Sequence, residues 1–73
     1  MGKGTRKLSN SLRELREKRG ITQQELADRV GVTRQTVIAI EGNKYSPSLE
    51  VAFMVAQALR ARIEEVFQYD ERG

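Results

Sequence analysis

The sequence predicts an all-α domain of five short helices, and three observations support this prediction. Apolar residues recur at spacings of three and four in several short segments, as they do in helices that bury one face. Side chains that cap helices and glycines that end them separate these segments. With 73 residues and no cysteine, the chain can build one small core without disulfide bonds. We expect the domain to span residues 8–69.

A first helix is predicted to begin within residues 9–11 and to end at Arg19. All three residues of that start carry side-chain oxygens that can cap a helix. Three leucines recur at helical spacing, and Gly20 is placed where a glycine commonly ends a helix. These leucines are Leu8, Leu12 and Leu15.

Two more helices are predicted within residues 23–42. Thr22 and Glu25 form the capping-box pattern T-x-x-E at the start of the first. Thr33 is positioned to cap the second, which we expect to run from residue 34 to about residue 41. The residues of their inner faces are Leu26, Ala27 and Val30 in the first helix, and Val37 and Ile40 in the second.

The connection between these two helices predicts their crossing. Gly31 lies where the chain must turn sharply. Two helices that cross steeply over a turn of three or four residues leave no room for a side chain larger than that of Ala27. This pattern is typical of a helix-turn-helix, whose second helix can enter the major groove of DNA.

The last two helices follow the only proline, Pro47, which prevents the preceding helix from continuing. Ser48 is the expected cap of a helix over residues 49–59, and a short helix is expected over residues 63–67. The predicted buried stripe of the longer helix comprises Leu49, Ala52, Phe53, Ala56 and Leu59, with Val55 at its edge.

The composition excludes several classes of function. The chain has neither histidine nor cysteine, so it lacks imidazole and thiolate metal ligands and the usual catalytic base and nucleophile. We expect no metal, no cofactor and no enzymatic activity. No apolar run reaches the length of a membrane span, and the N-terminus has no signal-peptide pattern, so a cytoplasmic protein is expected.

Charge is distributed unevenly within a formal net charge of +3. Residues 1–20 carry seven basic and two acidic side chains, whereas residues 45–73 carry three basic and five acidic ones. A basic end suits a protein that binds a polyanion on one side. Residues 1–7 are interpreted as a flexible basic arm, which either reaches a DNA groove or is an unstructured start, and residues 70–73 as a polar tail.

The stretch from Thr22 to Gly42 resembles the phage-repressor type of helix-turn-helix, the Cro/CI or xenobiotic-response-element family. The likeness includes Gln23, Glu25-Leu26-Ala27, Val30-Gly31-Val32, Thr33-Arg34-Gln35-Thr36-Val37 and Ile40-Glu41. It implies a lambda-repressor-like fold and a sequence-specific regulator of transcription, more often a repressor, that binds palindromic double-stranded DNA as a homodimer. Arg60-Ala61-Arg62 departs from the family pattern of glycine, aliphatic residue and cap. Either the fourth helix is longer, or the fifth begins without a side-chain cap.

Candidate site residues follow from the motif. Base contacts are expected from Arg34, Gln35, Thr36 and Ala39, because these side chains offer hydrogen bonds to base edges or methyl groups to thymine. Phosphate contacts are expected from Gln23, Thr33, Asn43, Lys44 and Ser46. The alternative is that these are ordinary polar surface residues. The resemblance also implies a structural ion pair between Arg16 and Glu41.

Apolar residues near the C-terminus suggest a dimer interface. The candidates are Val55, Leu59, Ile63, Phe67 and Tyr69. The alternative is that all five pack within one chain. A second possible function is that of a protein-interaction module, such as an antitoxin, with secondary DNA binding, and an exposed apolar patch on the last two helices would favour it.

Overall fold

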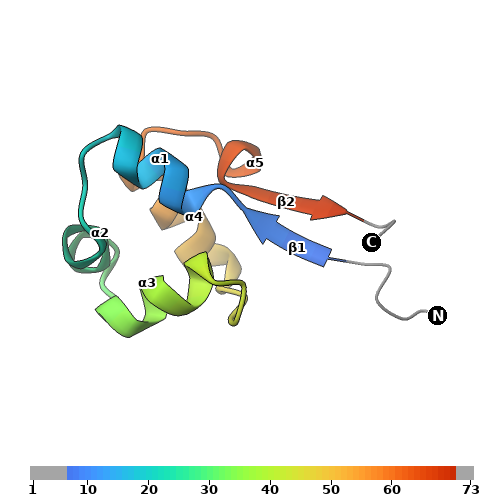
Figure 1. The fold of residues 1–73 in the computed structure, drawn as a ribbon, viewed down its shortest axis with the longest axis horizontal. Coiled ribbons are helices and arrows are strands. Elements are labelled where there is room, and N and C mark those ends of the chain that lie inside the picture. Colours follow the sequence, from blue (N-terminus) through green and yellow to red (C-terminus); the bar gives the residue numbers. More distant parts are fainter. Residues whose placement is uncertain (1–6, 71–73) are drawn as a thin grey trace.

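The computed structural model describes residues 7–70 and contains the five predicted helices (Figure 1). They are α1 (Leu12–Lys18), α2 (Gln23–Val30), α3 (Arg34–Glu41), α4 (Leu49–Ala58) and α5 (Ile63–Val66). Two strands, β1 (Lys7–Asn10) and β2 (Phe67–Asp70), were not predicted. Residues 1–6 and 71–73, which hold most of the predicted arm and tail, lie outside the described part of the chain. Within residues 7–70, no helix is both long and apolar enough to cross a membrane.

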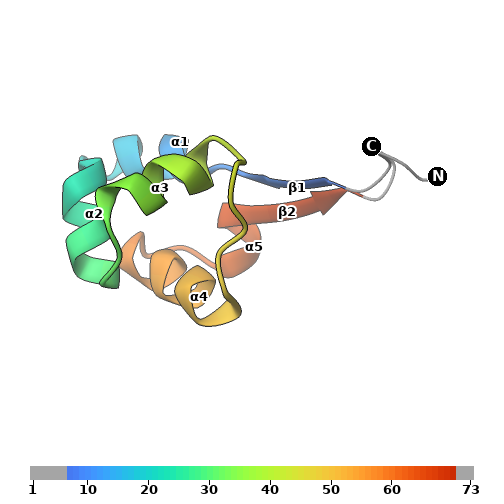
Figure 2. The ribbon, with the colours of Figure 1, turned by 90° about the horizontal axis from the view of Figure 1, so that it is seen from below.

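The two strands come from opposite ends of the chain and form an antiparallel sheet, which we call the terminal ribbon (residues 7–10 and 67–70). Leu8 lies opposite Tyr69, and Asn10 lies opposite Phe67. The ribbon extends away from the helical body in both views (Figures 1 and 2). Helical periodicity cannot reveal such a pairing, because each strand has only four residues and its partner is distant in the sequence.

The ribbon corrects the predicted boundaries at both ends of the domain. The first helix begins at Leu12 rather than within residues 9–11, and the last helix ends at Val66 rather than at Phe67. Lys7 and Asp70, which we had placed in the arm and tail, belong to the strands.

The caps of α2 and α3 confirm the local prediction. Thr22 Oγ1 accepts a hydrogen bond from the Glu25 amide at 3.0 Å, and Glu25 Oε1 accepts one from the Thr22 amide at 2.9 Å. Thr33 Oγ1 accepts from the Thr36 amide at 3.1 Å. These bonds satisfy amides that have no partner within their own helix.

One core holds all five helices together. Its most deeply buried large side chains are Leu12, Leu26, Val37, Ile40, Val55, Leu59 and Val66. Ala27 is also fully buried at the crossing of α2 and α3, as its size predicts. Gly31, with φ of 85°, makes the left-handed turn between these two helices. The core thus sets the orientation of α3 relative to α2.

The predicted stripe of α4 was wrong at two positions. Leu49 and Phe53 are 72% and 48% exposed, whereas Val55, which we had placed at the edge, is 1% exposed. The core side of α4 is instead formed by Ala52, Val55, Ala56 and Leu59. These four positions follow the spacing i, i+3, i+4, i+7 of a single helical face, from which Phe53 is turned away, while Leu49 is the first residue of the helix.

Of the two forms expected for the connection between α4 and α5, the structure shows the second, in which α5 begins without a side-chain cap. Helix α4 ends where Arg60 adopts a left-handed conformation (φ 55°) and the Ala61 amide donates to the Ala56 oxygen at 2.9 Å. At the start of α5, the Arg62 amide donates to Glu65 Oε1 at 2.7 Å, and no side chain caps the helix from the preceding position. Arg19 covers the end of α4, because its Nε donates to the Leu59 oxygen at 2.7 Å.

Candidate nucleic-acid interface

The outward face of α3 consists of Arg34, Gln35 and Ile38, all of which are exposed. On the opposite side, Val37 and Ile40 are each 1% exposed and hold the helix on the core. The predicted base-contacting residues Arg34 and Gln35 therefore point away from the protein.

Ile38 was missed by the sequence analysis, although it is 39% exposed and lies on the same face as Gln35. Counting 100° per residue from the buried Val37 and Ile40 would have placed it there. Thr36 and Ala39, which were predicted to contact bases, are half-buried and, being three residues apart, lie on the same side of this face. Thr36 is also within 3.0 Å of Thr33 through their hydroxyl oxygens.

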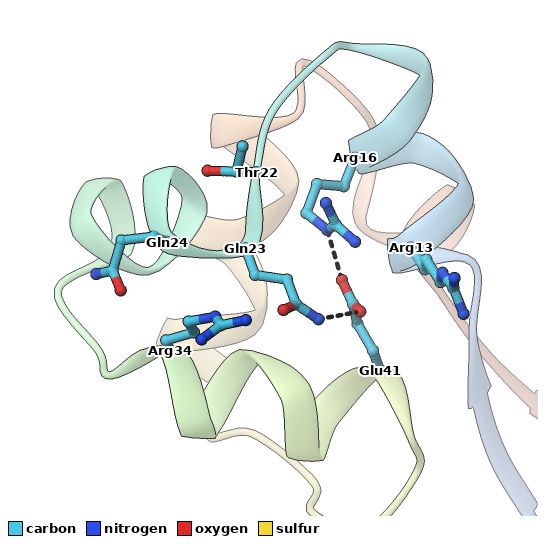
Figure 3. Close-up of a pocket in the computed structure, with 7 residues that line it drawn as sticks. All are labelled: Arg13, Arg16, Thr22, Gln23, Gln24, Arg34 and Glu41. Carbon is cyan, nitrogen blue, oxygen red and sulfur yellow. Dashed lines mark hydrogen bonds and ion pairs between the residues drawn. The ribbon is translucent and has the colours of Figure 1, made fainter.

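An ion pair joins α1 to the end of α3. Arg16 Nε lies 2.7 Å from Glu41 Oε2, and the two side chains are only 10% and 7% exposed (Figure 3). Arg16 Nη1 also donates to the Ile21 oxygen at 2.9 Å, and Gln23 Nε2 donates to Glu41 Oε1 at 3.1 Å. Both oxygens of the buried carboxylate therefore have donors. The role of the pair is structural, because it fixes α1, the start of α2 and the end of α3 against one another.

Beside this network the protein surface forms a polar concavity (Figure 3). Its lining residues are Arg13, Arg16, Thr22, Gln23, Gln24, Arg34 and Glu41. The N-terminus of α2 lies at this concavity, and the first amides of a helix favour an anion. The guanidinium groups of Arg13 and Arg34 add positive charge to the same surface. The donors and the positive charge of this surface suit an anion such as a phosphate group.

Two details of the concavity go beyond the prediction. The amide nitrogen of the Gln23 side chain donates one of its two hydrogens to Glu41, so its second hydrogen and the backbone amide of Gln23 remain as donors for a phosphate. Arg13 was not among the predicted contact residues, yet it lines the concavity and also pairs with Glu17 at 3.2 Å. No sequence signal identified it, because the packing of α1 beside α2 and α3 places it there.

The loop after α3 brings three of the predicted phosphate-contacting residues to the other end of that helix. Asn43, Lys44 and Ser46 are all exposed. Asn43 adopts a left-handed conformation (φ 58°) that ends α3, and its Oδ1 accepts from Asn10 Nδ2 at 2.9 Å. Its own Nδ2 is thus the donor that remains. Among the described residues, neither Lys44 nor Arg34 has an ion-pair partner.

Comparison with known proteins identifies this arrangement. A family model described as helix-turn-helix matches residues 12–66, which contain all five helices. The chain belongs to the Cro/CI type of this helix-turn-helix family. It is a family of DNA-binding transcriptional regulators and not a class of enzymes.

Curated relatives agree with the family. An uncharacterized HTH-type transcriptional regulator of Methanothermobacter thermautotrophicus is 57% identical over 63 residues, which cover 85% of this chain and 91% of the relative. The HTH-type transcriptional regulator YgzD of Bacillus subtilis is 44% identical over 66 residues, which cover 90% of this chain and 100% of the relative.

Solved structures confirm the lambda-repressor-like helix-turn-helix fold. The restriction-modification controller protein C.AhdI of Aeromonas hydrophila is similar with a TM-score of 0.70 and 35% identity, over 74% of this chain and 82% of that chain. The transcriptional regulator VanUg has a TM-score of 0.74 at 19% identity, over 99% of this chain and 96% of that chain. The second likeness supports the fold alone.

In this helix-turn-helix regulator, the predicted interface residues are not all on the surface. Val55 and Leu59 are 1% and 0% exposed, so their assignment to an interface was wrong because they form part of the core. Ile63 and Phe67 are half-buried against that core. Tyr69, at the outer part of the terminal ribbon, is 59% exposed. Only this last residue offers most of its side chain to another molecule.

Proposed function

We propose that this helix-turn-helix regulator binds a palindromic DNA operator as a homodimer, inserts α3 into the major groove and represses transcription. The observation that carries the proposal is the outward face of α3, where Arg34, Gln35 and Ile38 project from a rigidly held helix. Gln35 suits paired hydrogen bonds to adenine, and Arg34 suits guanine or a phosphate. The methyl groups of Ile38 and Ala39 suit thymine.

Phosphate groups on both sides of the groove would hold α3 in place. At one side lies the concavity formed by the start of α2 with Arg13 and Arg34. At the other side lies the loop with Asn43, Lys44 and Ser46. Contacts of this kind set the position of a protein on DNA without reading sequence. Thr33, whose hydroxyl caps α3, would contribute near the first of them.

Repression follows from the same binding geometry. A dimer on two half-sites one helical turn apart covers the duplex, and a covered promoter is closed to polymerase by simple exclusion. An activator needs a further surface that contacts polymerase. Repression therefore requires only DNA binding and is the simpler assignment.

A second candidate function is the capture of another protein, as in the antitoxin reading. The exposed apolar surface of α4, formed by Leu49, Phe53 and Met54, favours it. The antitoxin HipB of Escherichia coli K12 is a distant relative, 33% identical over 52 residues, which cover 71% of this chain and 59% of the relative. We rank this candidate second because the α3 face and both phosphate-binding surfaces are unexplained by it.

Selection from a random duplex library tests the proposal. The salt concentration must be held constant, because non-specific affinity for DNA depends steeply on salt. Enrichment of a palindrome whose half-site centres lie about 10 base pairs apart would support a dimeric sequence reader. Binding to DNA without enrichment of any particular sequence would contradict the proposed function and favour binding to another protein as the function. The sign of regulation is then measured with a reporter gene placed downstream of the selected site.

A further inference from the structure

The terminal ribbon presents apolar side chains that the rest of the described chain covers only in part. Leu8 and Tyr69 are direct partners in the ribbon, and Phe67 lies on the same face as Tyr69 because it is two residues away. Phe67 packs against the core, whereas Tyr69 is 59% exposed and Leu8 is half-buried. A sheet of two strands is marginally stable unless another surface packs against it.

The inner end of the ribbon is attached to the C-terminal end of α3. Asn10 Nδ2 donates to the Ile40 oxygen at 2.8 Å and to Asn43 Oδ1 at 2.9 Å. In both views the ribbon continues past the end of α3 along the longest axis of the molecule (Figures 1 and 2). The position of the ribbon is therefore coupled to that of α3, the helix proposed to enter the major groove.

The spacing of major grooves sets where a second copy must meet the first. Two recognition helices one helical turn apart are separated by about 34 Å, so the two-fold axis lies about 17 Å from the middle of each α3. Half of an eight-residue helix accounts for about 6 Å of this distance. Leu8 lies two residues outward from Asn10 along β1, which adds about 7 Å and leaves about 4 Å to the axis, within the reach of a side chain. The two-fold axis therefore falls beside the Leu8–Tyr69 pair.

We propose that the terminal ribbon is the contact between two copies of this chain, with the Leu8–Tyr69 pair of each copy beside the two-fold axis. This inference rests on the proposed binding to a palindrome. A second copy is the occupant because an apolar pair on a two-fold axis meets an identical apolar pair, which is self-complementary. The distance from the middle of α3 to the Leu8–Tyr69 pair also fits a second copy bound at the next half-site on DNA. By contrast, α4 lies on the other side of the helical body from α3 and does not follow the ribbon outward (Figure 2), so its exposed Phe53 is not placed at this spacing.

Cysteine cross-linking tests the proximity directly. The chain has no cysteine, so Tyr69→Cys introduces a unique thiol, and Phe53→Cys on α4 is the matched control. On a duplex carrying the selected palindrome, Y69C should form a disulfide-linked dimer under mild oxidation, whereas F53C should not. A cross-linked dimer from F53C, or none from Y69C, would overturn the proposal. The thiol at either position replaces an exposed aromatic side chain, so the core is untouched.

Binding measurements with charge variants separate this proposal from the proposed function. Tyr69→Glu should lower affinity for the palindrome about 100-fold, because the avidity of two linked half-sites is lost. Its affinity for a single half-site should match that of the wild type, and Phe53→Glu should change neither value. Failure of the wild type to distinguish a half-site from a scrambled duplex would refute the proposed function. Discrimination by the wild type combined with unchanged palindrome affinity of Y69E would refute the ribbon contact alone.

Discussion

Asn10 Nδ2 donates a hydrogen bond to the main-chain oxygen of Ile40 at 2.8 Å, which joins the end of β1 to the last turn of α3. The same nitrogen lies 2.9 Å from Asn43 Oδ1, and the Asn10 oxygen accepts from the Leu12 amide at 3.1 Å. One amide side chain thus accepts from the first amide of α1, satisfies a terminal carbonyl of α3 and orients Asn43 in the loop after α3. The recognition helix is held by the N-terminal strand as well as by the core.

Replacement of Asn10 should therefore affect both stability and DNA binding. Asn10→Ala removes the cap of α1 and the donor to α3, and we expect the free energy of unfolding to fall by about 1–2 kcal/mol. Asn10→Asp keeps the acceptor for Leu12 but turns a carboxylate oxygen toward two other oxygens, so it should be more destabilising than alanine. Urea denaturation measures both changes. Ser9→Ala, a neighbouring strand position, is the control, and equal stability of all variants would contradict the linking role.

The buried ion pair gives a second prediction. Arg16→Ala leaves Glu41 buried without its cation and should lower stability by about 3 kcal/mol. Arg13→Ala is the matched control on the same helix, because the exposed pair of Arg13 with Glu17 should contribute less than about 0.5 kcal/mol. Thermal melting distinguishes the two variants. A melting temperature of Arg16→Ala equal to that of the wild type would show that the pair has no structural role.

A single substitution in the turn after α4 should make the protein more stable. Arg60 holds a left-handed conformation, with φ of 55°, in which a β-carbon is strained and glycine is not. Arg60→Gly should raise the free energy of unfolding by about 0.5–1 kcal/mol, since the relieved strain exceeds the added flexibility of the unfolded chain. Arg62→Gly, at an extended position with φ of −83°, should instead destabilise. The prediction fails if the two substitutions shift the denaturation midpoint in the same direction.

The two kinds of DNA contact should respond differently to mutation. Gln35→Ala should reduce discrimination at one base pair by about 1–3 kcal/mol and leave the salt dependence of binding nearly unchanged. Lys44→Ala should weaken binding to all sequences and reduce the slope of log affinity against log salt by about 1. Titrations of matched and mismatched duplexes at several salt concentrations measure both effects. A sequence-specific loss in Lys44→Ala would reverse its assigned role.

Several features of this protein were predictable because short-range chemistry determines them. The capping box of Thr22 and Glu25 lies within one helical turn, and so does the cap formed by Thr33. The spacing of Val37 and Ile40 predicts which side of α3 is buried. Their pattern, with Ala27 at the crossing and Gly31 at the turn, indicates the helix-turn-helix. Each of these signals depends on residues that are close in the sequence, and such residues stay close together in any fold that contains the helix.

Other features depend on which distant segments come together, and only the tertiary structure decided them. Four residues at each end of the chain become strands because each supplies the hydrogen-bonding partner of the other. Leu49 and Phe53 are exposed because the other helices pack against Val55, Ala56 and Leu59 instead. The sequence by itself determined the helix-turn-helix and the buried side of its second helix, since helical periodicity and caps are local. The tertiary structure decided how Asn10 and the terminal ribbon hold that helix, since those contacts join residues far apart in the chain.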